Sequence, residues 1–141
     1  MPKYLGIDFG KKRTGIAETD DIPLIASALE TVETKELIPW LTAYLDTHDV
    51  AGLVVGQPIQ YDGSTAPVEE DILKFIDEVK KRFPDLEIHR IDESFSSRDA
   101  VRSMVTAGVG KKKRRTKGNV DKIAATLILR EFLEQIGTRT S

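Results

Sequence analysis

The sequence predicts an α/β fold with a five-stranded mixed sheet, in which the first three strands are antiparallel and helices cover both faces. Three patterns favour this fold. Residues 4–31 hold three strand-like segments separated by short gaps, as in an antiparallel meander. Residues 51–56 form a continuous apolar run, which is typical of a strand buried on both faces. From there to residue 92 the order is strand, helix, strand, which predicts a parallel crossover.

The first two strands are predicted to form a hairpin. Residues 4–9 alternate between large apolar side chains and other side chains, which predicts a half-buried strand with Asp8 near its end. Gly10 begins a short turn that carries three cations, and residues 14–19 return as the second strand. Residues 23–31 are expected to form the third strand.

Two helices are predicted in the first two thirds of the chain from apolar residues at helical spacing. The first covers residues 37–45. Thr34 is a candidate cap for it, but Pro39 lies too deep for a first turn that starts there, so the helix start is open. The second is a long amphipathic helix whose apolar face runs from residue 68 to 83, with Ser64 or Thr65 as its cap and Pro67 in its first turn.

The last third of the chain completes the order of elements. Residues 86–92 predict the fifth strand, and a capping box at Ser96–Asp99 begins another helix. Residues 108–118 combine glycines with basic side chains and predict a mobile basic loop. Asn119 is expected to cap the final helix, which ends at Gly137. The 141 residues are expected to form one domain. The order of its predicted strands and helices is that of the ribonuclease H-like fold.

Composition excludes several classes of protein. The chain has no cysteine, which rules out disulfides, thiolate zinc sites and a cysteine nucleophile. No apolar run could span a membrane and no leader precedes the first strand, so we expect a cytoplasmic protein without a membrane partner. The net charge of −2 includes six cations within residues 111–117, so the rest of the chain carries −8. This asymmetry predicts a polyanionic partner that is gripped at one place.

Three carboxylates stand out by position. Asp8 ends the first strand, Glu93 ends the last strand, and Asp121 is expected in the first turn of the last helix. Carboxylates are ligands that Mg²⁺ prefers, and two close ions suit an in-line displacement at phosphorus. We therefore expect these three acids to be catalytic and to bind two Mg²⁺ or Mn²⁺ ions.

Each acid also has a plainer interpretation. Asp8 would simply end a strand, and Glu93 would be a solvated loop acid beside a structural Asp92. Asp121 would lie favourably near a helix N-terminus in any protein.

The expected contacts to nucleic acid are the cations of the first turn and of the basic stretch, together with one arginine in the helix that precedes that stretch. They are Lys11, Lys12, Arg13, Arg98, Lys111, Lys112, Lys113, Arg114, Arg115 and Lys117. Binding through such contacts to phosphate should weaken steeply as salt rises, because each contact releases about one counterion.

Four short motifs occur in order along nearly the whole chain. They are GIDFG at residues 6–10 with RTG at 13–15, VGQP at 55–58 with DG at 62–63, DESFSS at 92–97 and KGNVDKIAA at 117–125. In these motifs and their spacing the chain resembles the YqgF/RuvX family of bacterial RuvC-like nucleases.

The resemblance implies a function and a set of site residues. It implies 5′-end processing of the pre-16S ribosomal RNA, with Holliday junction resolution as the alternative, and metal-binding acids at Asp8, Glu93 and Asp121. The family pattern has an arginine after the Asp-Glu pair, whereas this chain has Ser94. If that arginine contacts phosphate in relatives, other cations of the predicted binding set take its place here.

Other functions stay open on the sequence. Symmetric cutting of a four-way DNA junction needs a dimer with two sites, and no dimer face is evident, so we expect a monomer or weak dimer that processes RNA. A non-catalytic RNA-binding module would keep the basic loop but leave the acids without metal. An actin-like ATPase or kinase shares the hairpin at Asp8-Phe9-Gly10, but closes two such domains around its nucleotide, and this chain supplies one.

Overall fold

A single mixed sheet organises the protein. The computed structural model describes residues 3–19, 25–58, 66–93 and 113–140. Its strands are β1 (Lys3–Asp8), β2 (Arg13–Thr19), β3 (Ala26–Glu33), β4 (Val50–Pro58) and β5 (Glu87–Glu93). They lie in the order β3-β2-β1-β4-β5, with β1–β3 antiparallel and β4 and β5 parallel to β1. The predicted five-stranded mixed sheet is confirmed.

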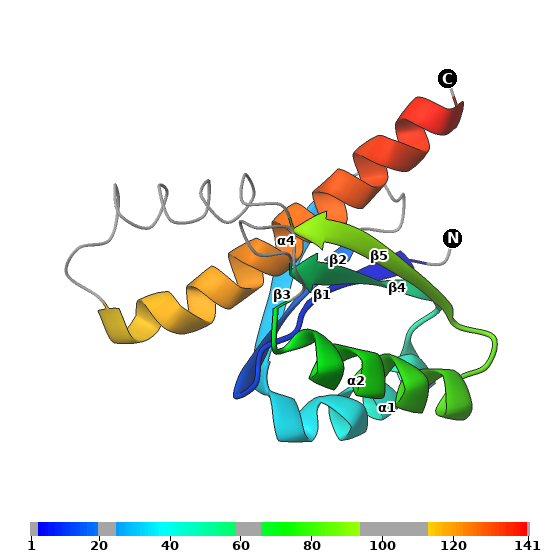
Figure 1. Ribbon diagram of the computed structural model, residues 1–141. Coiled ribbons are helices and arrows are strands. Elements are labelled where there is room, and N and C mark those ends of the chain that lie inside the picture. Colours follow the sequence, from blue (N-terminus) through cyan, green and yellow to red (C-terminus); the bar gives the residue numbers. More distant parts are fainter. Residues whose placement is uncertain (1–2, 20–24, 59–65, 94–112, 141) are drawn as a thin grey trace.

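Helices cover both faces of this sheet (Figure 1). They are the 3₁₀ turn η1 (Thr34–Glu36), α1 (Leu37–Thr47), α2 (Glu69–Arg82) and α4 (Lys113–Thr140). Pro39 lies in the first turn of α1, where its missing N–H removes no intrahelical hydrogen bond. Thr34 therefore begins the 3₁₀ turn rather than capping α1. In the part of the chain that the structure describes, no helix is long and apolar enough to cross a membrane.

The last helix begins earlier than predicted. α4 starts at Lys113 and continues through Gly118, Asn119 and Gly137, so the predicted loop is wrong from residue 113 onward. Lysine and arginine have high helix propensity, and one internal glycine costs only about 1 kcal/mol. Apolar periodicity reports packing against a core, and its absence does not exclude a helix. Residues 108–112, like the helix predicted after Ser96, lie outside the described residues.

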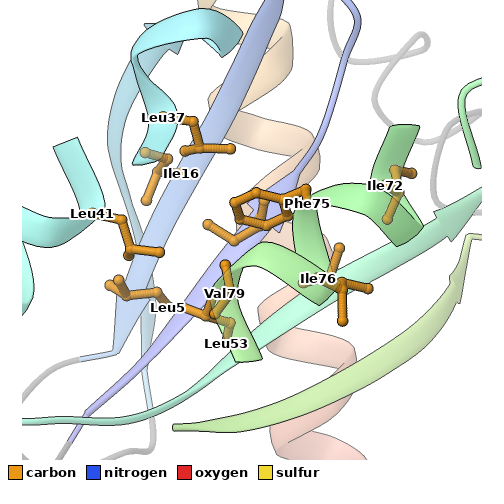
Figure 2. Close-up of a cluster of buried hydrophobic side chains, with 11 residues drawn as sticks. Leu5, Ile16, Leu37, Leu41, Leu53, Ile72, Phe75, Ile76 and Val79 are labelled. Carbon is orange, nitrogen blue, oxygen red and sulfur yellow. The ribbon is translucent and has the colours of Figure 1, made fainter. Parts of the chain in front are cut away.

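Two apolar clusters lie on opposite faces of the sheet, because β1 and β4 are covered on both sides. The cluster under α1 and α2, drawn in Figure 2, comprises Leu5, Ile7, Ile16, Leu37, Leu41, Leu53, Val55, Ile72, Phe75, Ile76 and Val79. The cluster under α4 comprises Ala17, Val54, Ile91, Ala125, Ile128, Leu129 and Phe132. Leu53 and Val55 belong to the first cluster and Val54 to the second, which confirms that the apolar run 51–56 is buried on both faces.

Candidate metal and nucleic-acid site

Asp8 is the last residue of β1, as predicted, and β1 is the central strand of the sheet. The backbone of β1 is paired with β2 on one side, up to Asp8 itself, and with β4 on the other side, up to Ile7. Asp8 is only 6% exposed, so a carboxylate with restricted freedom ends the central strand. Its partner across the antiparallel pair is Gly15.

Helix α4 approaches the sheet closely at two glycines. A Cβ added at Gly15 would overlap with the backbone carbonyl of Asp121, and one added at Gly6 would lie 2.7 Å from the carbonyl oxygen of Ala125. Positions 121 and 125 are one helical turn apart, so α4 lies against the backbone of β1 and β2 along this turn. Opposite residues of an antiparallel pair have Cα atoms only about 5 Å apart. The contact at Gly15 therefore brings Asp121 beside Asp8.

Asp121 lies deeper in its helix than predicted. It follows Lys113 by eight residues, more than two turns, so the prediction that it lies in the first turn is wrong. The helix-start interpretation of this acid fails with it, because the favourable effect of a helix N-terminus is confined to about the first turn. The position of Asp121 is instead set by the close contact of its backbone with β2 at Gly15.

The side chain of Asp121 makes an ion pair that the sequence did not suggest. Arg13, the first residue of β2, donates from Nε to Oδ2 of Asp121 at 3.2 Å. The Arg13 side chain is 44% exposed and that of Asp121 22%. The pair joins residues 108 positions apart in the sequence and lies at the end of the sheet where β1 finishes.

Thr34 holds the basic turn between β1 and β2 through hydrogen bonds. The Thr34 hydroxyl donates to the carbonyl oxygen of Gly10 at 2.6 Å, and its backbone N–H donates to that of Lys12 at 2.9 Å. The buried Thr14 hydroxyl lies 2.9 Å from the Thr34 hydroxyl and donates to it, since the Thr34 hydrogen is used at Gly10. The turn is thus held while Lys11 and Lys12 remain exposed.

The structure gives less detail for the two acids at the end of β5. Glu93 ends β5 as predicted, opposite Pro58 in the register, but its side chain lies outside the described part of the structure. Asp92 is exposed and follows Ile91, whose side chain packs under α4. The alternation of a strand therefore assigns Asp92 to the opposite face.

The predicted nucleic-acid contacts divide into three groups. Lys11, Lys12 and Arg13 are exposed beside the end of β1. The backbone of residues 113–117 forms the first turns of α4. Arg98, Lys111 and Lys112 lie outside the described residues, as does Ser94.

The donor chemistry fits a hard divalent cation. Asp8 and Asp121 offer only carboxylate oxygens, which suit Mg²⁺ and Mn²⁺. Among the described side chains, no three from His, Cys, Asp and Glu come together as a metal-binding group. The third predicted ligand, Glu93, is not among those side chains, so the three-acid set stays a prediction.

A second charged cluster was not predicted from the sequence. Arg90 on β5 donates to both carboxylate oxygens of Glu69, at 2.7 and 3.2 Å, and also to the carbonyl oxygens of Val55 and Gly56. The Glu69 side chain is only 9% exposed. A signal existed, because Glu69 lies on the apolar stripe of α2, three residues before Ile72. The cluster ties the start of α2 to β4 and β5.

Known proteins resemble this chain along almost its whole length. A family model described as "RuvX: Holliday junction resolvase" matches residues 2–135. A protein of Christiangramia forsetii named "Putative pre-16S rRNA nuclease" is 44% identical over 133 residues, covering 94% of this chain and 98% of the relative. A Bacteroides fragilis protein of the same name is 40% identical over 134 residues, covering 95% of this chain and 97% of the relative.

Solved structures share the fold at low identity. Thermus thermophilus RuvC in complex with a Holliday junction substrate superposes with a TM-score of 0.56 at 18% identity, covering 98% of each chain. Fowlpox virus resolvase with Holliday junction DNA gives 0.54 at 15% identity, covering 95% of this chain and 98% of the resolvase. These matches confirm the ribonuclease H-like fold. With the family model and the curated relatives covering almost the whole chain, the protein belongs to the RuvX family.

Proposed function

We propose that the protein is a divalent-metal-dependent nuclease that hydrolyses phosphodiester bonds in the 5′-end processing of pre-16S ribosomal RNA. The observation that carries the proposal is the contact of the Asp121 backbone with Gly15, the residue that pairs with Asp8 across the sheet, although Asp8 and Asp121 come from opposite ends of the chain. Exposed cations of the first turn adjoin this contact. The names of the curated relatives support ribosomal RNA as substrate.

The reaction assigned to this site is hydrolysis without a covalent intermediate on the protein. The water loses a proton and its oxygen bonds to phosphorus, while the bond from phosphorus to the 3′ oxygen breaks. The 3′ oxygen takes up a proton, so the products are a 5′-phosphate and a 3′-hydroxyl. Asp8, Asp121 and Glu93 would hold Mg²⁺ or Mn²⁺, two ions in the full set. The bound cations would supply activation of the water and neutralisation of charge on the phosphate.

The protein's own side chains have two further roles in this proposal. The burial of Asp8 and the anchoring of Asp121 at Gly15 keep both carboxylates in place before substrate arrives, which lowers the cost of assembling the site. Lys11 and Lys12, on a turn that Thr34 holds, would bind the backbone phosphates that flank the scissile bond.

A four-way DNA junction is the second candidate substrate. The description of the matching family model favours it. Ribosomal RNA ranks first because the curated relatives carry that name over nearly the whole chain. We propose a monomer or weak dimer, which suffices for trimming an RNA end but not for symmetric cutting of a junction.

The substrate test compares three nucleic acids with the purified protein. Precursor 16S RNA with an extended 5′ end, a four-way DNA junction and single strands are incubated with Mg²⁺, with Mn²⁺ or with EDTA. We expect metal-dependent cleavage of the RNA that leaves a 5′-phosphate. Cleavage of the junction alone would favour the second candidate, and binding without any cleavage would favour a non-catalytic RNA-binding module.

The site test replaces Asp8 or Asp121 with asparagine. We expect Asp8→Asn and Asp121→Asn each to reduce cleavage to background, because the amide keeps the volume of the side chain but not the negative charge. Asp92→Asn is the matched control, since Asp92 is exposed and assigned to the other face of β5, and it should keep activity. Urea unfolding of each variant distinguishes loss of chemistry from loss of fold. Full activity of Asp8→Asn, or a large loss of its stability, would contradict the proposed role.

A further inference from the structure

Arg13 is paired with a carboxylate that is proposed to bind a metal ion. Its Nε donates to Oδ2 of Asp121 at 3.2 Å, so one oxygen of a proposed metal-binding carboxylate already faces a cation. A guanidinium at this distance repels a divalent ion that approaches the same carboxylate. Full pairing of Asp121 with Arg13 and full ligation of a metal by Asp121 therefore oppose one another.

The pair is weak enough to be exchanged. The Arg13 side chain is 44% exposed, and ion pairs with such exposure contribute only about 0–1 kcal/mol. A divalent ion, with twice the charge and further oxygen ligands from Asp8, can displace the guanidinium at little cost. The contrast is the Arg90–Glu69 pair, where Glu69 is only 9% exposed and Arg90 is held by two backbone carbonyls as well.

A displaced Arg13 side chain has a second use close by. Arg13 begins β2 directly after Lys11 and Lys12, on the turn that Thr34 holds, and all three cations are exposed. The planar guanidinium binds phosphate oxygens through two parallel hydrogen bonds, which a lysine cannot do. Release from Asp121 would therefore add the strongest phosphate ligand of the turn.

We propose that Arg13 is a positioning residue that couples metal binding to nucleic-acid binding. Without metal it neutralises and orients Asp121, and with metal it is released to bind a backbone phosphate of the substrate. Metal and nucleic acid then strengthen each other's binding, as thermodynamic linkage requires. The inference rests on the proposed metal site and goes beyond it by naming the residue that links the two ligands.

The first experiment measures RNA binding in two metal states. Fluorescence anisotropy with a labelled single-stranded RNA is performed in EDTA and in Ca²⁺ at constant ionic strength, and a gel verifies that the RNA stays intact. Lys12→Gln is the matched control, an exposed cation of the same turn, and should weaken binding by the same factor in both states. Arg13→Gln should change affinity by less than about twofold in EDTA but weaken it about tenfold in Ca²⁺, because the charge-assisted contact of the guanidinium with phosphate is lost.

The second experiment needs no nucleic acid. Isothermal titration of the protein with Mn²⁺ should give tighter binding to Arg13→Gln than to the wild type, by several-fold, because the competing cation is gone. Asp8→Asn should weaken Mn²⁺ binding in the same assay.

The outcomes separate the two proposals. Equal weakening of RNA binding by Arg13→Gln in both metal states, or Mn²⁺ binding no tighter than wild type, would overturn the coupling while leaving the metal site in place. If the wild type binds no Mn²⁺, or binds it as well after Asp8→Asn, the proposed metal site itself fails. Thermal unfolding of Arg13→Gln verifies that the variant is folded in each assay.

Discussion

The two faces of the sheet are covered in different ways. On one face, α1 and α2 pack through large side chains such as Leu41 and Phe75 (Figure 2). On the other face, α4 packs through Ile128, Leu129 and Phe132 but also contacts the strands at Gly6 and Gly15, where backbone meets backbone. Large side chains can adjust their rotamers when a neighbour changes, whereas two backbones in contact have no such freedom. The proposed site lies on the face that has the less adjustable contact.

The ion pairs on the two faces also differ in how tightly they are held. Arg90 and Glu69 form a buried, doubly hydrogen-bonded pair, tied also to strand carbonyls, under α2. Arg13 and Asp121 form a single, partly exposed contact beside α4. The comparison indicates that the first pair holds α2 against β4 and β5 and that the second is available for exchange with a ligand. Variants on each face test this difference.

The largest effect is expected at the glycine contact. In Gly15→Ala the new methyl group overlaps with the carbonyl of Asp121, so α4 must move away from β2, at a cost of about 3 kcal/mol or more. Gly6→Ala is the graded control, since its Cβ would lie 2.7 Å from the carbonyl oxygen of Ala125, and should cost about 2 kcal/mol. Urea unfolding measures both. Equal stability of Gly15→Ala and wild type would show that α4 adjusts freely, contrary to the comparison.

The buried ion pair is expected to give the next largest effect. Glu69→Ala leaves the Arg90 guanidinium without its counter-charge and should lower the free energy of unfolding by about 3 kcal/mol. Adding Arg90→Met should recover part of that loss, because the unpaired charge is removed.

An exposed pair on the same helix is the matched control for the buried one. Arg82 and Glu78 are also 2.7 Å apart, but their side chains are 52% and 44% exposed. Glu78→Ala should therefore cost no more than about 1 kcal/mol. Similar losses in Glu69→Ala and Glu78→Ala would contradict the structural role of the buried pair.

The smallest effect is expected where α1 touches β2 through a polar contact. Tyr44 donates to Glu18 at 2.6 Å, and burial, followed by this hydrogen bond, raises the pKa of the Tyr44 hydroxyl above its ordinary value of 10.0. Tyr44→Phe should cost about 1 kcal/mol at neutral pH. Because the pKa is higher in the folded than in the unfolded protein, this stabilisation is complete below pH 10 and is lost as pH rises beyond it. Urea unfolding at pH 7, 9 and 10.5 should show a constant difference between wild type and variant that narrows only at the highest pH. A difference that narrows between pH 7 and 9 would contradict the assignment.

The sequence by itself determined the sheet and the place of Asp8 within it. The alternation of residues 4–9, the apolar run 51–56 and the strand–helix–strand order are local patterns, and each records which side of an element is buried. Short connections between the first three strands then left an antiparallel arrangement as the simplest solution. The family resemblance implies metal-binding roles for Asp8, Glu93 and Asp121, and these roles stay a prediction.

The remaining features depend on residues that lie far apart in the sequence. The Asp121 backbone contacts Gly15 of β2, and the Arg13–Asp121 pair joins residues 108 positions apart. The burial of Glu69 depends on Arg90 of another strand. Periodicity in a sequence reports which face of an element is buried, but not which partner buries it. Charges are positioned by that partner, because a charge is stable in a protein interior only when an opposite charge or a hydrogen bond meets it there.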